Sequence, residues 1–212
     1  MNEKFFDLKK EKQDRMINAA LKVFALHGYR HACTDDIVKE AAISKGLLFH
    51  YFGSKLGVYA FVYDYSVRYL LLELSTAVDA KETELFALLQ QVECGKMHAM
   101  CGYPYLQPFL NRAQAENVNE ALVAVEERKQ QMEEAYENIY ARADLGKYAA
   151  AEDVMKLRKM MELTIKGLMN ERILEDAFQP EMLYEEITEY LNLSRRLAER
   201  STQPSDEAFS EK

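Results

Sequence analysis

Apolar residues recur at intervals of three and four along most of this 212-residue chain, and this periodicity constrains the fold more than any other feature. No segment alternates apolar and polar residues as a half-buried strand would. Only eight glycines and four prolines are present, so few positions interrupt a helix. The pattern is typical of amphipathic helices that bury one face. The sequence therefore predicts an all-α protein of about nine helices.

The predicted helices fall into two domains, which we call the head (residues 1–55) and the body (residues 80–200). Three helices with short connections form the head, and a fourth helix over 54–79 is expected to connect it to the body. An apolar fraction of 49 % is sufficient for a buried core. Residues 201–212 are polar and are predicted to be disordered.

Charge is divided unevenly between the two ends of the chain. The net charge is −8, yet the first 55 residues contain ten basic and seven acidic residues and carry +3. The remaining residues contain 17 basic and 28 acidic residues and carry −11. A basic head on an acidic body favours contact with nucleic acid at one end only.

The sequence lacks the signals that are typical of several functional classes. No apolar run is long enough to span a membrane, and the mixed-charge N-terminus does not resemble a signal peptide. Three widely spaced cysteines favour a reduced, cytoplasmic protein over a disulfide framework. No serine-histidine-aspartate order, glycine-rich phosphate loop or paired carboxylates appears, so we expect no catalytic residue, no cofactor and no enzymatic activity.

Residues 33–52 have the spacing of a helix-turn-helix, in which two short helices are joined by a tight turn. Thr34 is expected to cap the first of these helices, and Ser44 opens the second. Between them, residues 41–43 form the predicted turn. Gly28 is expected to end the preceding helix as a C-cap.

The outer face of the helix that Ser44 opens combines small, basic and aromatic residues suited to DNA. Gly46 has no side chain and permits close approach of the backbone, whereas lysines neutralise phosphates. Hydroxyls and free N–H groups at helix N-termini receive phosphate oxygens. The residues expected to contact DNA are Thr34, Ser44, Lys45, Gly46, Phe49, His50, Tyr51 and Lys55.

Residues 13–65 resemble the DNA-binding domain of the TetR family of repressors. The matching segments are Ala19-Ala20-Leu21-Lys22-Val23-Phe24, Gly28-Tyr29, Thr34-Asp35-Asp36-Ile37-Val38-Lys39-Glu40-Ala41, Ser44-Lys45-Gly46-Leu47-Leu48-Phe49-His50-Tyr51-Phe52 and Ser54-Lys55. This resemblance implies DNA-contacting roles for the positions named above. Ala42 stands where that family usually has glycine, and Phe49 where it often has tyrosine. Cys33 stands where serine or threonine is usual.

The resemblance also implies a function. We expect a ligand-responsive regulator of transcription that binds double-stranded DNA as a homodimer, with half-sites about one helical turn apart or a multiple of it. The expected protein is a repressor that a small, largely apolar effector releases from a palindromic operator. The effector would move the fourth helix and thereby shift the heads.

Two sets of residues in the body are candidates for these roles. Aromatic and methionine side chains that favour an adaptable ligand pocket are Phe86, Leu89, Met97, Tyr103, Phe109, Met132, Tyr136, Tyr140 and Met160. The apolar stripes of the last two helices, as in other TetR-type proteins, favour a four-helix dimer seam. The residues expected there are Leu157, Met161, Thr164, Leu168, Leu183, Ile187, Tyr190 and Leu197.

Two alternative functions are also compatible with the sequence. Cys94, His98 and Cys101 share one helical face, which suits a metal-responsive or redox-responsive regulator, although a fourth ligand is not evident and no metal is expected. An acidic helical body also suits an adaptor that binds protein partners.

Overall fold

The computed structural model describes residues 3–148, 150–174 and 178–200, and these form nine α-helices, two short 3₁₀ helices and no strand. This confirms the predicted all-α class. The elements are η1 (Glu3–Phe5), α1 (Lys10–His31), α2 (Thr34–Glu40), α3 (Lys45–Phe52), α4 (Lys55–Ala77), α5 (Leu85–Gly102), α6 (Leu106–Gln114), α7 (Asn119–Tyr140), η2 (Leu145–Lys147), α8 (Ala151–Arg172) and α9 (Pro180–Arg200). The tail predicted to be disordered, 201–212, lies outside the described residues.

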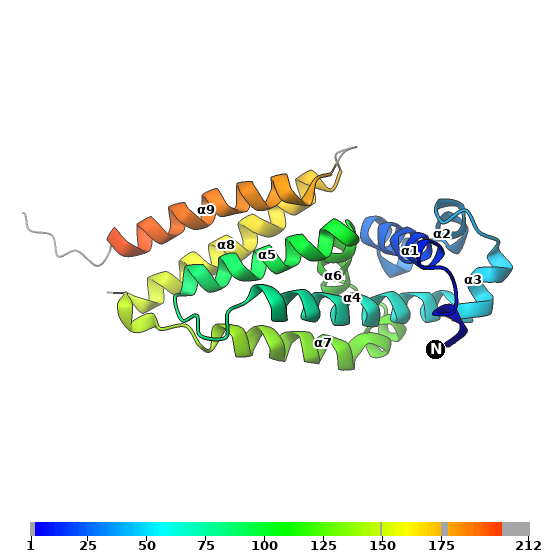
Figure 1. Ribbon diagram of the computed structural model, residues 1–212, viewed down its shortest axis with the longest axis horizontal. Helices are drawn as coiled ribbons and strands as arrows, with labels where there is room; N and C mark the ends of the chain where they lie inside the picture. Colours follow the sequence, from blue (N-terminus) through cyan, green and yellow to red (C-terminus); the bar gives the residue numbers. More distant parts are fainter. Residues whose placement is uncertain (1–2, 149, 175–177, 201–212) are drawn as a thin grey trace, which may run out of the picture.

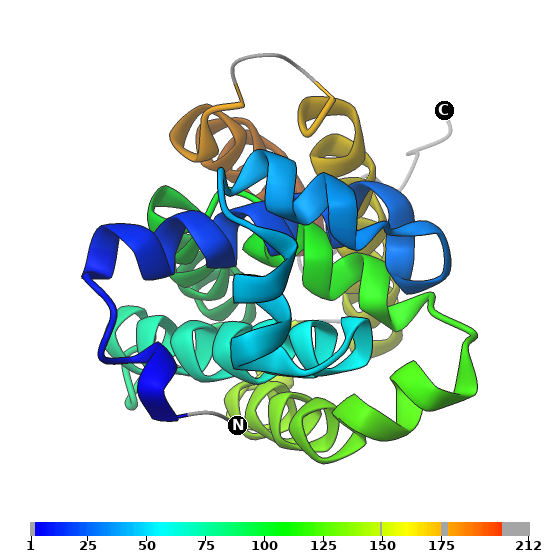
Figure 2. The same cartoon turned by 90° about the vertical axis from the view of Figure 1, so that its right-hand side faces the viewer.

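The long helices α4, α5, α7, α8 and α9 run roughly along one axis, whereas α1 runs across it, and α1, α2 and α3 lie together at one end (Figure 1). Helix α4 extends from this end into the body, where it packs against both α5 and α7. Helices α8 and α9 pack against each other, and α9 covers α5. Figure 2 shows α9 on the side of the body opposite α7. Among the described helices, none is both long enough and apolar enough to cross a membrane.

Two apolar clusters form the core. The larger joins the head to the body, because Phe24 and Ile37 of the head lie in the same cluster as Leu70 of α4 and Phe109 of α6. The second lies between α5, α8 and α9. The head is therefore packed onto the body rather than tethered by a linker.

Helix α1 is interrupted at Gly28, whose φ of 67° and ψ of 174° are not helical. The predicted interruption at glycine is present, because φ values of this sign are costly for residues with a Cβ atom, but the helix continues to His31 and its C-cap is Ala32 rather than Gly28. The break releases the backbone N–H of Tyr29, which donates to Glu116 Oε2 at 2.9 Å. The end of α1 is thus joined to the turn between α6 and α7.

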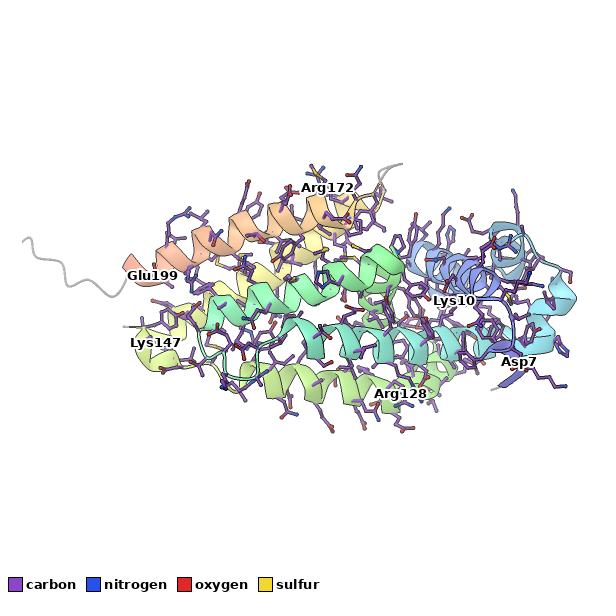
Figure 3. All side chains as sticks on the ribbon, in the orientation of Figure 1. Asp7, Lys10, Arg128, Lys147, Arg172 and Glu199 are labelled. Carbon is purple, nitrogen blue, oxygen red and sulfur yellow. The ribbon has the colours of Figure 1, made fainter. Side chains whose placement is uncertain are left out.

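Charged side chains cover the outer surface of the molecule (Figure 3). Lys10 and Asp7 lie at the head end, and Lys147 and Glu199 lie at the opposite end. Arg128 of α7 forms an ion pair with Asp64 of α4, which ties these two helices together outside the core.

Candidate nucleic-acid interface and effector pocket

Helices α2 and α3 pack through fully buried apolar side chains. Ile37 and Ala41 lie on the inner side of α2 and its C-cap, and Leu48 lies on the inner side of α3. The turn between them is a Schellman motif, because Ala42 N–H donates to the Lys39 carbonyl at 3.2 Å and Ile43 N–H to the Val38 carbonyl at 3.0 Å. The predicted helix-turn-helix geometry is therefore present.

The turn places Ala42 in the left-handed region, with φ of 51°. Among the described non-glycine residues, no other has positive φ. A residue with a Cβ atom pays about 1–2 kcal/mol in this region, whereas glycine does not. The fold therefore holds Ala42 in a conformation that favours glycine, and glycine is the residue that the TetR family usually has at this position.

Two serines cap the helices that flank the interface. Ser44 Oγ accepts a hydrogen bond from Leu47 N at 3.2 Å, and Ser54 Oγ accepts one from Gly57 N at 3.0 Å. The expectation that Thr34 caps α2 is wrong. Cys33 occupies the N-cap position there and makes no side-chain cap hydrogen bond, so Thr34 is the first helical residue.

The start of α3 faces solvent, as does His50 further along the helix. Ser44, Lys45, Gly46 and His50 are exposed, whereas Phe49 and Tyr51 are half-buried. A Cβ atom added at Gly46 would meet no atom within 4 Å. Nothing inside the chain therefore requires glycine at this position, although it lies in a helix, where glycine is unfavourable. An external surface that approaches the backbone would account for it.

The lysines of the interface are held by neighbouring groups. Lys45 Nζ lies 2.8 Å from Asp35 Oδ1, so α2 and α3 are joined by an exposed ion pair. Lys55 Nζ donates to the Arg30 carbonyl at 3.3 Å and lies 4.7 Å from the centre of the Tyr29 ring. Lys55 therefore fixes the start of α4 against the end of α1 as well as adding positive charge.

Sequence reasoning missed Phe5, which is fully buried in the head. Its ring lies 5.7 Å from the ring of Tyr51 and 5.0 Å from that of Phe61, so η1 supports one side of α3. The sequence feature that could have indicated this burial is an aromatic pair, Phe5 and Phe6, in an otherwise charged segment.

A pocket of about 240 Å³ lies between α5, α6, α7 and α8. It brings together four of the predicted ligand residues, namely Leu89, Met132, Tyr136 and Tyr140. The polar part of its lining was not predicted. These additional residues are Glu93, Lys96, Gln107, Asn111, Gln114, Arg158, Glu162 and Lys166.

Two cations of the pocket are held by aromatic rings and carboxylates. Lys96 Nζ lies 2.6 Å from Glu93 Oε1 and 5.4 Å from the centre of the Tyr136 ring. Burial alone would lower the pKa of Lys96, but the buried Glu93 carboxylate outweighs this effect and raises it. Lys96 therefore stays charged. The guanidinium of Arg158 lies 4.1 Å from the centre of the Tyr140 ring.

The other predicted ligand residues lie outside this pocket. Phe86 is buried in the cluster between α5, α8 and α9, and Phe109 packs against Phe24 in the larger cluster. Tyr103 donates to Asp14 at 2.6 Å and so contacts the head instead. Met97 is half-buried and Met160 is exposed, and neither lines the pocket.

The predicted dimer residues divide into buried and accessible groups. Met161, Leu183 and Ile187 are buried in the chain's own core, which corrects their assignment, because a second copy would not reach these side chains. Leu157, Thr164 and Leu168 are half-buried, and Tyr190 and Leu197 are exposed. The same two helices also present exposed apolar side chains that were not expected at the seam, namely Met155, Met160, Leu163, Met182 and Leu193.

The cysteine and histidine residues of α5 do not converge on one point. Cys94 Sγ lies 3.9 Å from His98 Nε2, whereas Cys101 Sγ contacts Met97 Sδ and Glu181 Oε1. Burial, together with the hydrogen bond to Glu181, raises the pKa of Cys101 to about 11, which keeps it a thiol. Within the described ranges, no group of three or more potential ligands is arranged to hold a metal ion.

The head matches a known protein family. Residues 16–60 match the family described as bacterial regulatory proteins, tetR family. The uncharacterised HTH-type transcriptional regulator YuxN of Bacillus subtilis (strain 168) is 48 % identical over 46 residues. This match covers 22 % of the present chain and 16 % of that protein, so the likeness is confined to about a sixth of its length.

Solved structures share the fold of nearly the whole chain. A TetR family transcriptional regulator from Chloroflexus aurantiacus has a TM-score of 0.60 and 20 % identity, with 94 % of this chain and 96 % of that chain covered. The fatty acid degradation regulator FadR from Bacillus halodurans has a TM-score of 0.54 and 20 % identity, with 84 % and 96 % covered. At these identities the likeness shows the fold, and with the family match it confirms the resemblance to the TetR family.

Proposed function

We propose, from the premise that this chain has a TetR-type helix-turn-helix on a TetR-type fold, that it binds an operator as a homodimer and regulates transcription in response to a small-molecule effector. The observation that carries this proposal is the exposed start of α3. There Ser44 fixes the helix N-terminus and Gly46 leaves the backbone open to a partner.

The chemistry of this surface suits DNA. Lys45 at the start of α3 and His50 in its second half are both exposed, so one helix presents groups suited to a phosphate contact and to a base contact. One short helix reads only a few base pairs, and a two-fold dimer doubles the site. Dimerisation is therefore part of the proposal.

The exposed apolar face of α8 and α9 is the surface that we propose for the dimer. Leu163 of α8 is 59 % exposed and Leu193 of α9 is 46 % exposed. At Gly167, an added Cβ atom would meet no atom within 4 Å, so a partner helix has room to approach. Tyr190 and Leu197, both predicted at the seam, remain part of this surface, and Leu157, Thr164 and Leu168 are half-buried beside it.

The pocket is placed so that a bound effector would act on the head through α6. Gln107 and Asn111 of α6 line the pocket. Phe109 of the same helix packs against Phe24 of α1, with ring centres 6.1 Å apart. A ligand that prefers one position of α6 would therefore shift the head and, with it, the start of α4. We propose that the effector thereby weakens operator binding and relieves repression.

A gel-shift assay tests this function. We expect the purified protein to retard DNA flanking its own gene more strongly than a coding fragment of equal length, and to bind less tightly as salt rises from 50 to 200 mM, as charge-driven DNA binding does. Replacing Lys45 by alanine should weaken retardation. The matched control is Lys147→Ala at the far end of the molecule (Figure 3), which should leave it unchanged. Absence of salt-sensitive binding would overturn the proposal.

A further inference from the structure

Polar atoms without hydrogen-bond partners gather in the pocket. Among the described residues, five buried side-chain nitrogen or oxygen atoms lack such a partner, and three of them belong to residues that line this one pocket. These three are Gln107 Oε1, Tyr136 Oη and Arg158 Nε. Because a buried polar group without a hydrogen bond is costly, their concentration at one place indicates a site built for a polar ligand.

The three atoms differ in what they require. Arg158 Nε is a donor, and its 3.3 Å ion pair with Glu162 does not have the geometry of a hydrogen bond. Burial raises the pKa of Tyr136, which keeps its hydroxyl protonated and able to donate. Gln107 is only 6 % exposed, and its Oε1 is an acceptor whose amide nitrogen already donates to Asn111 at 2.9 Å. The site therefore offers two donors and one acceptor.

The charges that line the pocket do not balance. Lys96, Arg158 and Lys166 are cations, whereas Glu93 and Glu162 are the carboxylates, so the lining carries one net positive charge. Lys96 and Arg158 each face one of these carboxylates, and Lys166 donates to the neutral Gln114 amide at 3.3 Å. One negative charge on a ligand would neutralise the pocket, whereas a phosphate monoester brings about −1.5 to −2 at neutral pH.

The rest of the lining is apolar. Leu89, Met132, Ile165 and Met169 are buried side chains that contribute to the pocket wall. With a volume of about 240 Å³, the pocket suits a compact metabolite rather than a long acyl chain. A ligand that fits must therefore combine an apolar part with a polar one.

We infer that the effector is a small organic acid with a single carboxylate, a compact apolar part and a separate hydrogen-bond donor. The carboxylate is bound by Arg158 and the Tyr136 hydroxyl, and the donor faces Gln107 Oε1. Arginine is well suited to this role because its planar N–H groups match a carboxylate. This inference rests on the proposed effector response and replaces the largely apolar effector expected from the sequence.

Calorimetric titration with a matched set of probes tests the inference. The probe is 3-(4-hydroxyphenyl)propanoate, compared with its neutral amide, with the amine 3-(4-hydroxyphenyl)propylamine, and with 3-phenylpropanoate, which lacks the hydroxyl donor. We expect the hydroxy acid to bind at least about tenfold more tightly than the amide and the amine, which corresponds to about 1.4 kcal/mol. Loss of the hydroxyl should weaken binding several-fold. If the acid does not bind, or binds no more tightly than the amide, the inference is overturned.

Two variants locate the binding. Arg158→Met should abolish the preference for acid over amide, whereas Lys156→Met, which removes an exposed charge from the same helix, should preserve it. Tyr136→Phe removes only the unpartnered hydroxyl and serves as a second test should Arg158→Met not fold. Tyr136→Phe should weaken binding of the acid several-fold and change binding of the amide less. An unchanged preference in both variants would place the acid elsewhere and overturn the assignment.

These titrations are made without DNA, so they separate this inference from the proposed function. Selective binding of the acid without any effect on operator affinity would support the ligand class and contradict the switch. Operator binding by a protein that shows no preference for the acid would support the regulator and contradict the ligand class.

Discussion

Glu116, in the turn between α6 and α7, accepts a hydrogen bond from the backbone N–H of Tyr29 at 2.9 Å, immediately after the break in α1. The hydroxyl of the same tyrosine donates to Glu120 of α7 at 2.5 Å. The end of α1 is thus held by the body at two points. Since α6 also lines the pocket, this contact lies on a physical connection between pocket and head.

Loss of the Glu116 carboxylate should destabilise the protein. Glu116→Ala leaves the buried Tyr29 N–H without its partner, so we expect the free energy of unfolding at pH 7 to fall by about 1–3 kcal/mol in urea denaturation. The control Glu126→Ala, on the exposed face of α7, should change it by less than about 0.5 kcal/mol. Equal effects of the two variants would contradict a structural role for this contact.

The same contact predicts a dependence on pH. Burial would raise the pKa of Glu116, but hydrogen bonds from Asn117, Tyr29 and Val118 N–H groups outweigh it and lower the pKa. A carboxyl with a lowered folded-state pKa stabilises the protein above its unfolded pKa, and this contribution disappears as the pH falls through the folded value. The difference between wild type and Glu116→Ala should therefore shrink at pH 3.

Replacing Ala42 by glycine should stabilise the head. The left-handed φ of 51° is unfavourable for alanine by about 1–2 kcal/mol relative to glycine, so Ala42→Gly should raise the free energy of unfolding by a similar amount. Its neighbour Ala41, which has a right-handed φ of −77° and a buried methyl group, provides the control. Ala41→Gly should lower stability, and a loss of stability in both variants would contradict the account of the turn.

Gly46→Ala should separate stability from DNA binding. An added methyl group meets no atom of the chain and favours the helix, so the free energy of unfolding should rise by roughly 0.5 kcal/mol. Binding to DNA, measured by fluorescence anisotropy, should weaken several-fold because the added methyl group keeps the backbone of α3 further from the DNA. Unchanged DNA affinity would show that no partner approaches at this glycine.

A charge on the exposed face of α8 should prevent dimerisation. Leu163→Glu introduces a carboxylate where we propose that a second copy packs, and sedimentation should then show a monomer. Leu72 of α4 is 61 % exposed but lies outside this face, so Leu72→Glu should sediment as wild type does. A dimeric Leu163→Glu variant would place the seam elsewhere.

The helix-turn-helix could be predicted because its determinants are local. The spacing of Ile37 and Leu48, the serine that caps α3 and the glycine that breaks α1 each act within a few residues. The conformation of Ala42 was not predicted, because the turn imposes it against the preference of the residue.

The polar half of the pocket could not be predicted, because its burial depends on helices that meet only in the folded chain. Glu93, Lys96 and Arg158 have the sequence pattern of solvated charges, yet mutual pairing and the rings of Tyr136 and Tyr140 allow them to line a cavity. Three residues expected at the dimer seam are buried within the chain for a related reason. Helices α8 and α9 each carry two apolar faces, and the face with Met161 and Ile187 packs inside the chain.

The measurement that most directly tests DNA reading by α3 compares His50→Ala on an operator and on random DNA of equal length. Because His50 lies on the exposed face of α3, its loss should cost about 1–3 kcal/mol on the operator and much less on random DNA. Lys55→Ala, which removes a charge at the start of α4, should weaken both complexes alike. Equal losses for His50→Ala on the two DNAs would contradict sequence reading by α3.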